Sequence, residues 1–404
     1  MVQMEQLIQA YYTTRRNKRR SADSVRFELH WHRNLLRLKE AIDTRSVRPT
    51  AYTFVTTKPR PREVFACDMA TRVIHHYIDI RLRPLIESEL TDRTFNNRIG
   101  YGPNEAINAL ISDIYEVSRG GTRDAWIIKM DLQGYFPNAD QDIVYGQLRD
   151  LVERKYDGDD IEDLLYMIQA AVYSYPTRHC YRKSPLWCWE AIPRGKSLFS
   201  KPDGIGGAIG HLIWQNAMNY YLNDLDHAIL EEWGLHYVRF VDDMVIVTDN
   251  KDACLSFVVP EVRRRLAEKN CRLHPSKFYC QHYTKGVEFI GAYIKCGRVY
   301  VNNRIVRNAI AAVRRHNRRI RQSRVYTFTQ SANSHLGIFK TRNGFNVARR
   351  YLAEVSPKWW EYCELDERNM KIVPKVSKID YLSNKYHLKR KRKSWKTTMK
   401  SRSN

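Results

Sequence analysis

The feature that most constrains this chain is a pair of adjacent aspartates, Asp242 and Asp243, set between apolar residues. The segment Phe240-Val-Asp-Asp-Met-Val245 and its flanks predict a hairpin of two strands, 236–241 and 244–248, that turns at the aspartates. Neighbouring carboxylates among buried residues repel each other and lose hydration, so they need a compensating cation. An acidic turn in solvent is the alternative, because Asp-rich turns are common.

A third carboxylate ends another apolar run, Ala125-Trp-Ile-Ile-Lys-Met-Asp131, which has the pattern of a buried strand. Three aspartates on neighbouring strands can hold two divalent cations about 3.5–4 Å apart. Such ions lower the pKa of an attacking hydroxyl and bind a triphosphate with its leaving pyrophosphate. Oxygen ligands and phosphate partners favour Mg²⁺ over zinc. The three aspartates therefore predict a two-metal phosphoryl-transfer site.

The charge of the chain points to a polyanionic partner. Its 404 residues carry a formal net charge of +24, concentrated at 15–20, at 314–324 and in the tail at 389–393. Nucleic acid is the commonest partner of such a chain, although a solubility bias over the whole surface is the alternative. A hydrophobic fraction of 43% is that of a globular protein, and the length suits two or three subdomains.

Several classes of protein are disfavoured. No stretch is apolar enough to cross a bilayer and the N-terminus lacks a signal-peptide core, so we expect a cytoplasmic protein without a membrane partner. The eight cysteines form no C-x-x-C pair and match no histidine spacing, which argues against a structural zinc site and a disulfide framework. The pairs His30/His32 and His75/His76 lack a third ligand nearby in sequence, so we interpret them as satisfied structural histidines.

Apolar periodicity predicts the remaining elements. Helices are expected at 24–45, 68–90 with Asp68 as N-cap, 103–118, 141–173 with a break at 156–160, 211–232, 257–269 and from 302 onward, and an extended stretch at 52–57. The run Asp157-Gly-Asp-Asp160 lacks apolar flanks and predicts a solvated turn. Aromatic and basic residues at 174–201 predict an irregular insertion that either stacks on single-stranded bases or packs internally.

The order of these segments resembles motifs A to E of reverse transcriptases. The matching segments are Asp131 with Tyr135-Phe136, Ile209-Gly210, Phe240-Val-Asp-Asp243, Leu273-His-Pro-Ser-Lys277 and Gly286-Val-Glu-Phe-Ile-Gly291. The resemblance covers roughly residues 10 to 350, and an ordered set is far more specific than one motif. Within the family the chain is most similar to bacterial retroelement enzymes, namely diversity-generating and unknown-group, phage-defence reverse transcriptases. Their fingers segments match 15–20, 25–28, 62–66 and 72–76.

This resemblance implies an α+β right-hand polymerase fold with fingers, a palm that contains an antiparallel sheet and the catalytic hairpin, and a helical thumb. The expected divisions are fingers at 1–115, palm at 116–140, a fingers insertion at 141–203, palm again at 204–298, thumb at 299–384 and a basic tail at 385–404. We expect the tail to be mobile unless nucleic acid orders it.

The resemblance also assigns roles to the metal site. Asp131 and Asp242 would be the bridging ligands and Asp243 a weaker third carboxylate, with Leu132 beside them in the metal site. The implied cofactor is a pair of Mg²⁺ ions. Lys277 would be the motif D lysine, which protonates or neutralises the leaving pyrophosphate.

Further residues are assigned to substrate binding. Phe136 stands where the family places its steric gate, which excludes the ribose 2′-hydroxyl; a plain core aromatic is the alternative. Arg62, Arg72 and Arg98 are candidates for the triphosphate because that group needs cations. Each is also a candidate for an ordinary surface or structural arginine.

Motif B departs from many family members, which carry a Gln-Gly pair where this chain has Ile209-Gly210. Gln215 fits the end of the motif, whereas Trp214 replaces a serine of the diversity-generating enzymes. An aliphatic residue at 209 removes a polar contact beside the nascent base pair, so we hypothesise relaxed fidelity. The neighbouring glycines lack a P-loop lysine and predict a flexible loop near the template.

The implied activity is RNA-directed DNA synthesis from dNTPs on an RNA template, with DNA as the product. The altered motif B favours antiphage defence with a dedicated non-coding RNA over a mutagenic role in a diversity-generating retroelement. Two rivals belong to other classes: a nucleic-acid-binding scaffold with a vestigial site, and a two-metal nuclease or integrase-like hydrolase, which would need further carboxylates. An accessory protein or a homo-oligomer is left open.

Overall fold

The computed structural model describes residues 1–16, 18, 21–57, 60–178 and 180–375. The expected basic tail and part of the 15–20 cluster lie outside these residues. The chain divides into two compact units, Met1–His282 and Tyr283–Asn404, and each is described by itself. Among the described residues, every helix is too short or too polar to span a lipid bilayer.

The first unit combines eleven described α-helices with two small sheets. The helices are α1 (Met4–Arg15), α2 (Ala22–Glu28), α3 (Trp31–Asp43), α4 (Met69–Glu89), α5 (Pro103–Val117), α6 (Gln141–Lys155), α7 (Ile161–Val172), α8 (Leu212–Tyr220), α9 (Asn223–His227), α10 (Lys251–Ala253) and α11 (Val259–Glu268). The strands are β1 (Ala51–Thr56), β2 (Arg62–Cys67), β3 (Trp126–Asp131), β4 (Cys180–Arg182), β5 (His236–Phe240), β6 (Asp243–Thr248) and β7 (Tyr279–His282).

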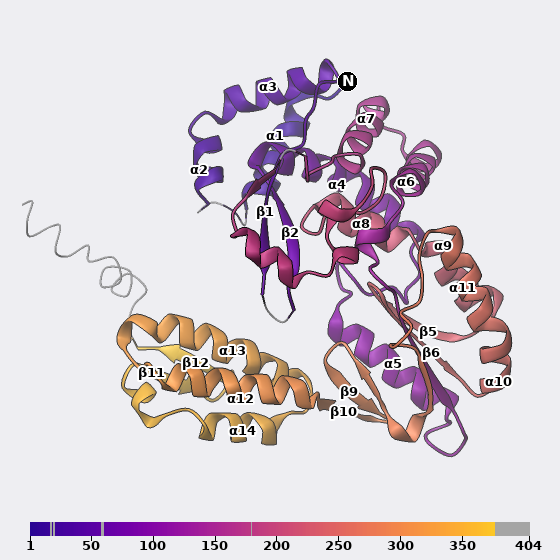
Figure 1. Ribbon diagram of the computed structural model, residues 1–404, viewed down its shortest axis with the longest axis vertical. Coiled ribbons are helices and arrows are strands. Elements are labelled where there is room, and N and C mark those ends of the chain that lie inside the picture. Colours follow the sequence, from indigo (N-terminus) through magenta and orange to yellow (C-terminus); the bar gives the residue numbers. More distant parts are fainter. Residues whose placement is uncertain (17, 19–20, 58–59, 179, 376–404) are drawn as a thin grey trace, which may run out of the picture. The chain divides into compact units, whose positions relative to one another are not determined.

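The larger sheet has the order β5-β6-β3-β7 and is antiparallel throughout. Because side chains alternate along a strand, its two faces differ. One face carries Ile128, Met130, Met244 and Ile246 into the main core, which α8 and α11 also line. Helix α5 packs along β5 on the opposite face (Figure 1). Helices on both faces therefore fix this sheet.

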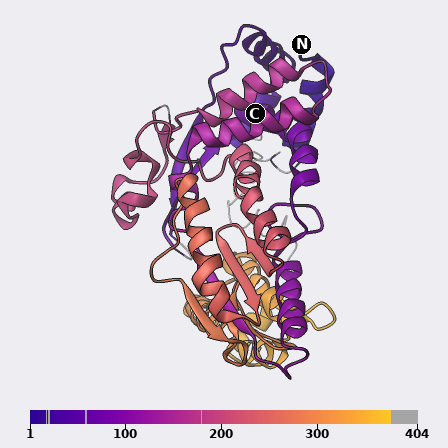
Figure 2. The same cartoon turned by 90° about the vertical axis from the view of Figure 1, so that its right-hand side faces the viewer.

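The smaller sheet has the order β2-β1-β4, in which β1 pairs antiparallel with β2 and parallel with β4. The long helix α4 follows β2 directly and packs against α1 and α8. Asp68 caps this helix as predicted, since its carboxylate accepts a hydrogen bond of 2.8 Å from the backbone N–H of Thr71. Helices α6 and α7 lie side by side in both views (Figures 1 and 2).

Two predicted long helices are interrupted by tertiary contacts. The helix expected at 24–45 is wrong as one element, because the chain turns at Leu29 and His30 and Asn34 Nδ2 donates to the carbonyl of Phe27 at 3.0 Å. The helix expected at 211–232 breaks at Tyr221, whose hydroxyl donates to the carbonyl of Lys269 at 2.6 Å. In both places a contact from a neighbouring element outweighs local periodicity.

The predicted solvated turn at 157–160 is also wrong at its last residue. Asp160 is only 3% exposed, and its carboxylate accepts hydrogen bonds from Arg81 Nε at 2.8 Å and from the hydroxyls of Tyr77 and Tyr156. These partners compensate the buried charge. Burial opposes ionisation of Asp160, but the two tyrosine hydroxyls and the Arg81 guanidinium outweigh it and lower the pKa of this carboxyl.

The second unit pairs a sheet of the order β10-β9-β8 with three helices and a hairpin. Its elements are β8 (Val287–Phe289), β9 (Ala292–Lys295), β10 (Arg298–Val301), α12 (Asn303–Asn317), α13 (Val325–Thr341), α14 (Phe345–Ala353), β11 (Cys363–Asp366) and β12 (Lys371–Pro374). Phe328 stacks on Trp359 in its core, with ring centroids 4.3 Å apart. The predicted helices are present, whereas the β11–β12 hairpin was not predicted. Asn333 fixes it through two hydrogen bonds with the backbone of Ile372.

Candidate functional site

The three aspartates meet at one end of the larger sheet. Asp131 is the last residue of β3 and lies opposite Asp243, the first residue of β6. Asp242 lies in the turn before β6, and its carbonyl accepts a hydrogen bond of 3.1 Å from the backbone N–H of Leu132. The strand register thus brings together carboxylates from distant parts of the sequence.

The turn differs by one residue from the predicted one. Strand β5 ends at Phe240 and β6 begins at Asp243, so Val241 and Asp242 form the turn. Val241 has φ 60°, a conformation in which a β-branched side chain is strained. Such strain persists only where surrounding structure holds it, and here it lies in the turn that leads to Asp242, directly before β6.

A fully buried arginine supports this turn from the core side of the sheet. Arg239 donates from Nη1 to the carbonyl of Val241 at 3.3 Å, from Nη2 to the carbonyl of Asn219 at 2.7 Å, and from Nε to the carboxylate of Asp226 at 2.8 Å. Both members of the Arg239–Asp226 ion pair have fully buried side chains. Burial opposes the charge of Arg239, yet the Asp226 carboxylate keeps the pKa of this guanidinium above its ordinary value. The alternation of side chains along β5 does not reveal from the sequence that the charged residue Arg239 points into the core.

The electrostatics of the aspartates are those of a crowded anionic site. Asp131 is 8% exposed, whereas Asp242 and Asp243 are partly exposed. Burial raises the pKa of Asp242 to about 6, and the nearby charges of Asp131 and Asp243 add to the shift. Burial also raises the pKa of Asp243, against the opposing effect of Lys129. Burial and the mutual repulsion of the carboxylates both favour a bound cation, because a cation would offset each of them.

Two lysines pair with the aspartates. Lys277 Nζ lies 2.6 Å from Asp131 Oδ1, and Lys129 Nζ lies 3.3 Å from Asp243 Oδ1. Lys277 reaches the site from the turn before β7. Lys129 was not predicted, although it precedes Asp131 by two residues on the same strand face. The ammonium groups show that this end of the sheet attracts cations.

The donor set matches hard divalent ions. The site offers carboxylate oxygens, which are the ligands that Mg²⁺ prefers, and no sulfur or imidazole among these residues. Leu132 can contribute only its backbone carbonyl, because its side chain is buried and apolar. The arrangement can therefore hold divalent cations next to Lys277, a proton donor.

Phe136 lies directly after the carboxylate strand, in a short 3₁₀ turn. Its ring is partly buried and meets Tyr135 edge-on, with centroids 5.9 Å apart. The hydroxyl of Tyr135 donates to the carbonyl of Met218 at 2.5 Å, so a buried anchor positions the neighbouring ring. Both the steric-gate and the core interpretations of Phe136 agree with this location.

The Ile209-Gly210 segment is fixed against strand β2. The carbonyl of Ile209 accepts a hydrogen bond of 2.8 Å from the backbone N–H of Phe65. Gly210 has φ 108°, and a Cβ at this position would lie 2.5 Å from the carbonyl oxygen of Phe65. Only glycine fits this close approach. Trp214 is buried beneath the preceding loop, while Gln215 is partly exposed on α8.

The three candidate arginines have different environments. Arg62 is exposed at the start of β2. Arg72 is partly buried and lies 4.0 Å from Asp23, with Nη1 buried and unpaired. Arg98 donates from Nη1 to the carbonyls of Thr91 and Thr94, at 2.6 and 2.8 Å. The guanidinium of Arg98 is thus engaged within its own loop, which leaves Arg62 as the most accessible candidate.

The insertion at 174–201 was expected either to pack internally or to present aromatic rings to single-stranded bases, and its residues divide between packed and exposed positions. Arg182 lies over the ring of Phe199 at 4.0 Å, and Trp189 packs against the same ring. Tyr181 and Trp187 are 72% and 67% exposed. Part of the insertion therefore packs internally, and part presents rings to solvent.

The interpretation of His75 and His76 as satisfied structural residues is wrong. His75 is buried and His76 partly buried within α4, but His75 Nε2 and His76 Nδ1 have no hydrogen-bond partner. Burial lowers the pKa of both imidazoles, so both are neutral near pH 7.

The family described as "Reverse transcriptase (RNA-dependent DNA polymerase)" matches residues 55–294, which is more than half of the chain. That range includes all three aspartates and Lys277. No curated protein matches the chain.

Two similar solved structures are telomerases. Apo telomerase from Candida tropicalis, truncated from its C-terminal domain, is 11% identical with a TM-score of 0.45, and the match covers 68% of this chain and 60% of that chain. Telomerase from Candida albicans, in complex with a fragment of telomeric RNA, is 10% identical with a TM-score of 0.46, over 79% of this chain and 61% of that one. The chain thus spans less than two thirds of either telomerase.

Proposed function

Because the chain belongs to the reverse transcriptase family, we propose that it is an RNA-directed DNA polymerase that joins dNTPs into DNA on an RNA template. The observation that carries this proposal is the register of β3 and β6, which puts Asp131 opposite Asp243 and next to the Asp242 turn. A nucleic-acid partner also agrees with the net charge of +24.

Reverse transcriptases use divalent metal ions, and the residues here fit such ions. Asp131, Asp242 and Asp243 would hold them, with the carbonyl of Leu132 as a further oxygen. We propose two Mg²⁺ ions, because hard oxygen ligands and phosphate partners favour Mg²⁺. When bound, such ions activate the primer 3′-hydroxyl and neutralise charge on the triphosphate.

Side chains of the protein would protonate the leaving group and bind the substrate. Lys277 carries a proton beside Asp131 and can donate it to the leaving pyrophosphate. Phe136 follows the carboxylate strand closely enough to exclude a 2′-hydroxyl from the adjacent sugar. Arg62 is exposed at the start of β2 and can pair with the triphosphate. Ile209, Gly210 and Gln215 would border the nascent base pair, with Arg72 and Arg98 as further candidates for phosphate contacts.

For the biological role we infer a cytoplasmic enzyme of antiphage defence that uses a dedicated non-coding RNA. This inference rests on the resemblance to bacterial retroelement enzymes and on Trp214 in place of a motif B serine. A mutagenic role in a diversity-generating retroelement is the second candidate. A paired template and variable repeat beside the gene would overturn the defence role, and an accessory protein or self-association would appear on copurification.

The test of the activity is primer extension with purified chain, an RNA template, labelled dNTPs and Mg²⁺. We expect incorporation that Asp242→Asn reduces by roughly 10²–10³-fold or more, because a charge that stabilises the transition state is lost. Asp249→Asn is the matched control, since Asp249 is an exposed aspartate at the end of the same hairpin. It should retain full activity.

The rival functions predict other outcomes of the same assay. A vestigial scaffold would bind the primer and template but incorporate no nucleotide in the presence of Mg²⁺ or Mn²⁺. A hydrolase would shorten the labelled nucleic acid without extending it. Either result would refute the polymerase proposal.

A further inference from the structure

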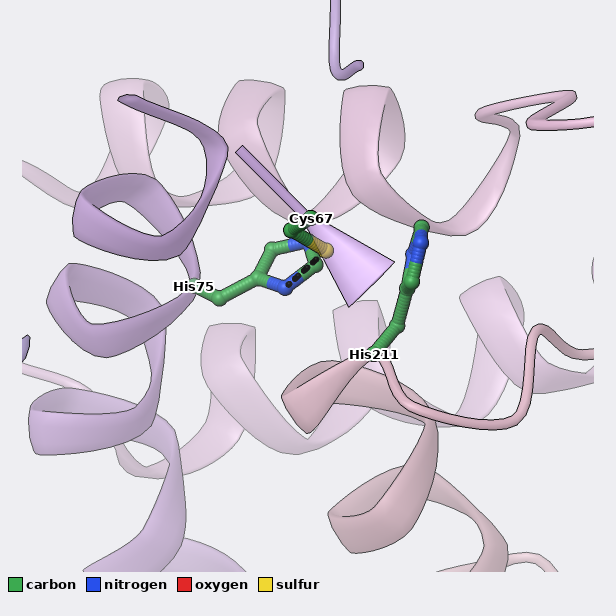
Figure 3. Close-up of side chains that lie close together, drawn as sticks. All are labelled: Cys67, His75 and His211. Carbon is green, nitrogen blue, oxygen red and sulfur yellow. Dashed lines mark hydrogen bonds between the residues drawn. The ribbon is translucent and has the colours of Figure 1, made fainter. Parts of the chain in front are cut away.

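A second group of polar side chains lies inside the first unit, formed by Cys67, His75 and His211. Cys67 ends β2, His75 belongs to α4, and His211 directly precedes α8 (Figure 3). The three residues are only 2%, 2% and 1% exposed. One ligand atom from each lies within 4.8 Å of the other two. Figure 3 shows His75 and His211 on either side of the cysteine sulfur.

The polar atoms of this group lack ordinary partners. The Cys67 sulfur contacts His75 Nδ1 at 3.7 Å, but His75 Nε2 and both ring nitrogens of His211 have no hydrogen-bond partner. Buried polar atoms in native proteins are almost always paired, so a buried imidazole close to the thiol with neither ring nitrogen paired, that of His211, needs an explanation. A cation bound by the sulfur and by one nitrogen of each ring supplies one, because sulfur and imidazole nitrogen are both ligands of transition metals.

The spacing of the group suits zinc. Standard Zn–S and Zn–N bonds in a tetrahedral site place sulfur and nitrogen about 3.6 Å apart. The observed separation of the Cys67 sulfur and His75 Nδ1 is 3.7 Å. The third ligand atom is within 4.8 Å, so a shift of about 1 Å in the His211 ring would complete the set.

We propose that Cys67, His75 and His211 bind one zinc ion. On binding, the Cys67 S–H bond breaks and its proton passes to solvent, while one Zn–S and two Zn–N bonds form. A water molecule occupies the fourth position. Arg72 carries a positive charge on the same helix as His75, and the Asp23 carboxylate, 4.0 Å away, offsets that charge. This site differs in ligand chemistry from the carboxylate site and does not depend on the proposed polymerase activity.

The zinc ion would tie β2 and α4 to the segment that contains Ile209 and Gly210. That segment already receives the backbone hydrogen bond of Phe65, two residues before Cys67. His211 follows Gly210 directly, so a bond from the metal to its imidazole is a second link between the same two parts of the chain. The zinc therefore holds the Ile209-Gly210 backbone in place from its buried side.

The first test is the zinc content of the full chain, purified without a histidine tag and dialysed against metal-free buffer. We expect about one zinc per chain by mass spectrometry. Cys67→Ala and His211→Gln should each reduce the content to below about a tenth of the wild-type value. Cys271→Ala is the matched control, because Cys271 is also a buried free cysteine, 3% exposed, outside the group. It should keep its zinc.

The second test uses the wild-type chain and so does not depend on how the variants fold. A strong chelator should lower Tm by at least about 4 °C, and added zinc but not Mg²⁺ should restore it. Cobalt(II) added to the stripped protein should give a thiolate charge-transfer band, which Cys271→Ala retains and Cys67→Ala loses. Wild-type protein that contains no zinc and takes up none would overturn the proposal. So would Cys67→Ala with wild-type zinc, or copper in place of zinc.

Discussion

The buried ion pair behind the β5–β6 hairpin gives the sharpest test of how the fold supports the candidate site. Asp226 accepts hydrogen bonds from Arg239, from the hydroxyl of Tyr237 at 2.9 Å and from the hydroxyl of Thr94 at 3.0 Å. Asp226→Asn keeps the shape of the side chain but leaves the Arg239 guanidinium charged and uncompensated. Breaking a buried ion pair in this way destabilises a protein by about 3–5 kcal/mol.

That loss is large compared with the total stability of a domain, about 5–15 kcal/mol. With a urea m-value of about 1–3 kcal/mol/M, the unfolding midpoint of Asp226→Asn should fall by roughly 1–5 M. Unfolding is followed by circular dichroism. Asp224→Asn is the matched control: Asp224 is exposed and lies 3.2 Å from Lys269, so its loss should change stability by less than about 1 kcal/mol.

A double variant separates the charge from the turn. Asp226→Leu with Arg239→Met removes both charges, and replacing a buried pair by apolar residues is often neutral or stabilising. We therefore expect the double variant to be more stable than Asp226→Asn. It should still lose polymerase activity, because Val241 no longer receives the hydrogen bond of Arg239. An unfolding midpoint of Asp226→Asn equal to that of the wild type would refute the reasoning.

Three further predictions concern the site itself. Lys129→Gln removes the cation beside Asp243 that opposes a bound metal, so the Mg²⁺ concentration at half-maximal activity should fall by roughly 2–5-fold in a titration; an increase would contradict this. Phe136→Ala should raise ribonucleotide incorporation relative to dNTPs by about 10-fold or more, and unchanged discrimination would favour a core role for this ring. Ile209→Gln should lower misincorporation in primer extension, whereas a wild-type error rate no worse than that of the variant would count against relaxed fidelity.

Much of the architecture could be predicted from the sequence. The α+β class with an antiparallel sheet and a right-hand polymerase fold is confirmed by the family match and the mixed helices and strands. The hairpin was predictable because strands 236–241 and 244–248 are apolar and short. The division into fingers, palm and thumb stays a prediction, as do the roles of the site residues and the bacterial subgroup.

The features that escaped prediction arise from contacts between distant parts of the chain. Arg239 alternates with Val238 and Phe240 as a surface residue would, and only Asp226 makes its burial tolerable. Cys67 and His75 lie eight residues apart, but His211 comes from another element, so no local spacing reveals the group. The positive φ of Val241 is set by the surrounding hydrogen bonds, and it moves the turn by one residue.

The two segments with positive φ, at Val241 and at Gly210, are held in the same way. Val241 and Gly210 both have positive φ, and each is held through a backbone carbonyl next to the strain: that of Val241 by Arg239, and that of Ile209 by the N–H of Phe65. Both supports come from buried residues, Arg239 and Phe65, whose positions are fixed by packing. Since a displacement of about 1 Å can reduce a reaction rate roughly 100-fold, changes at Asp226 or Cys67 should impair catalysis without contact with the substrate.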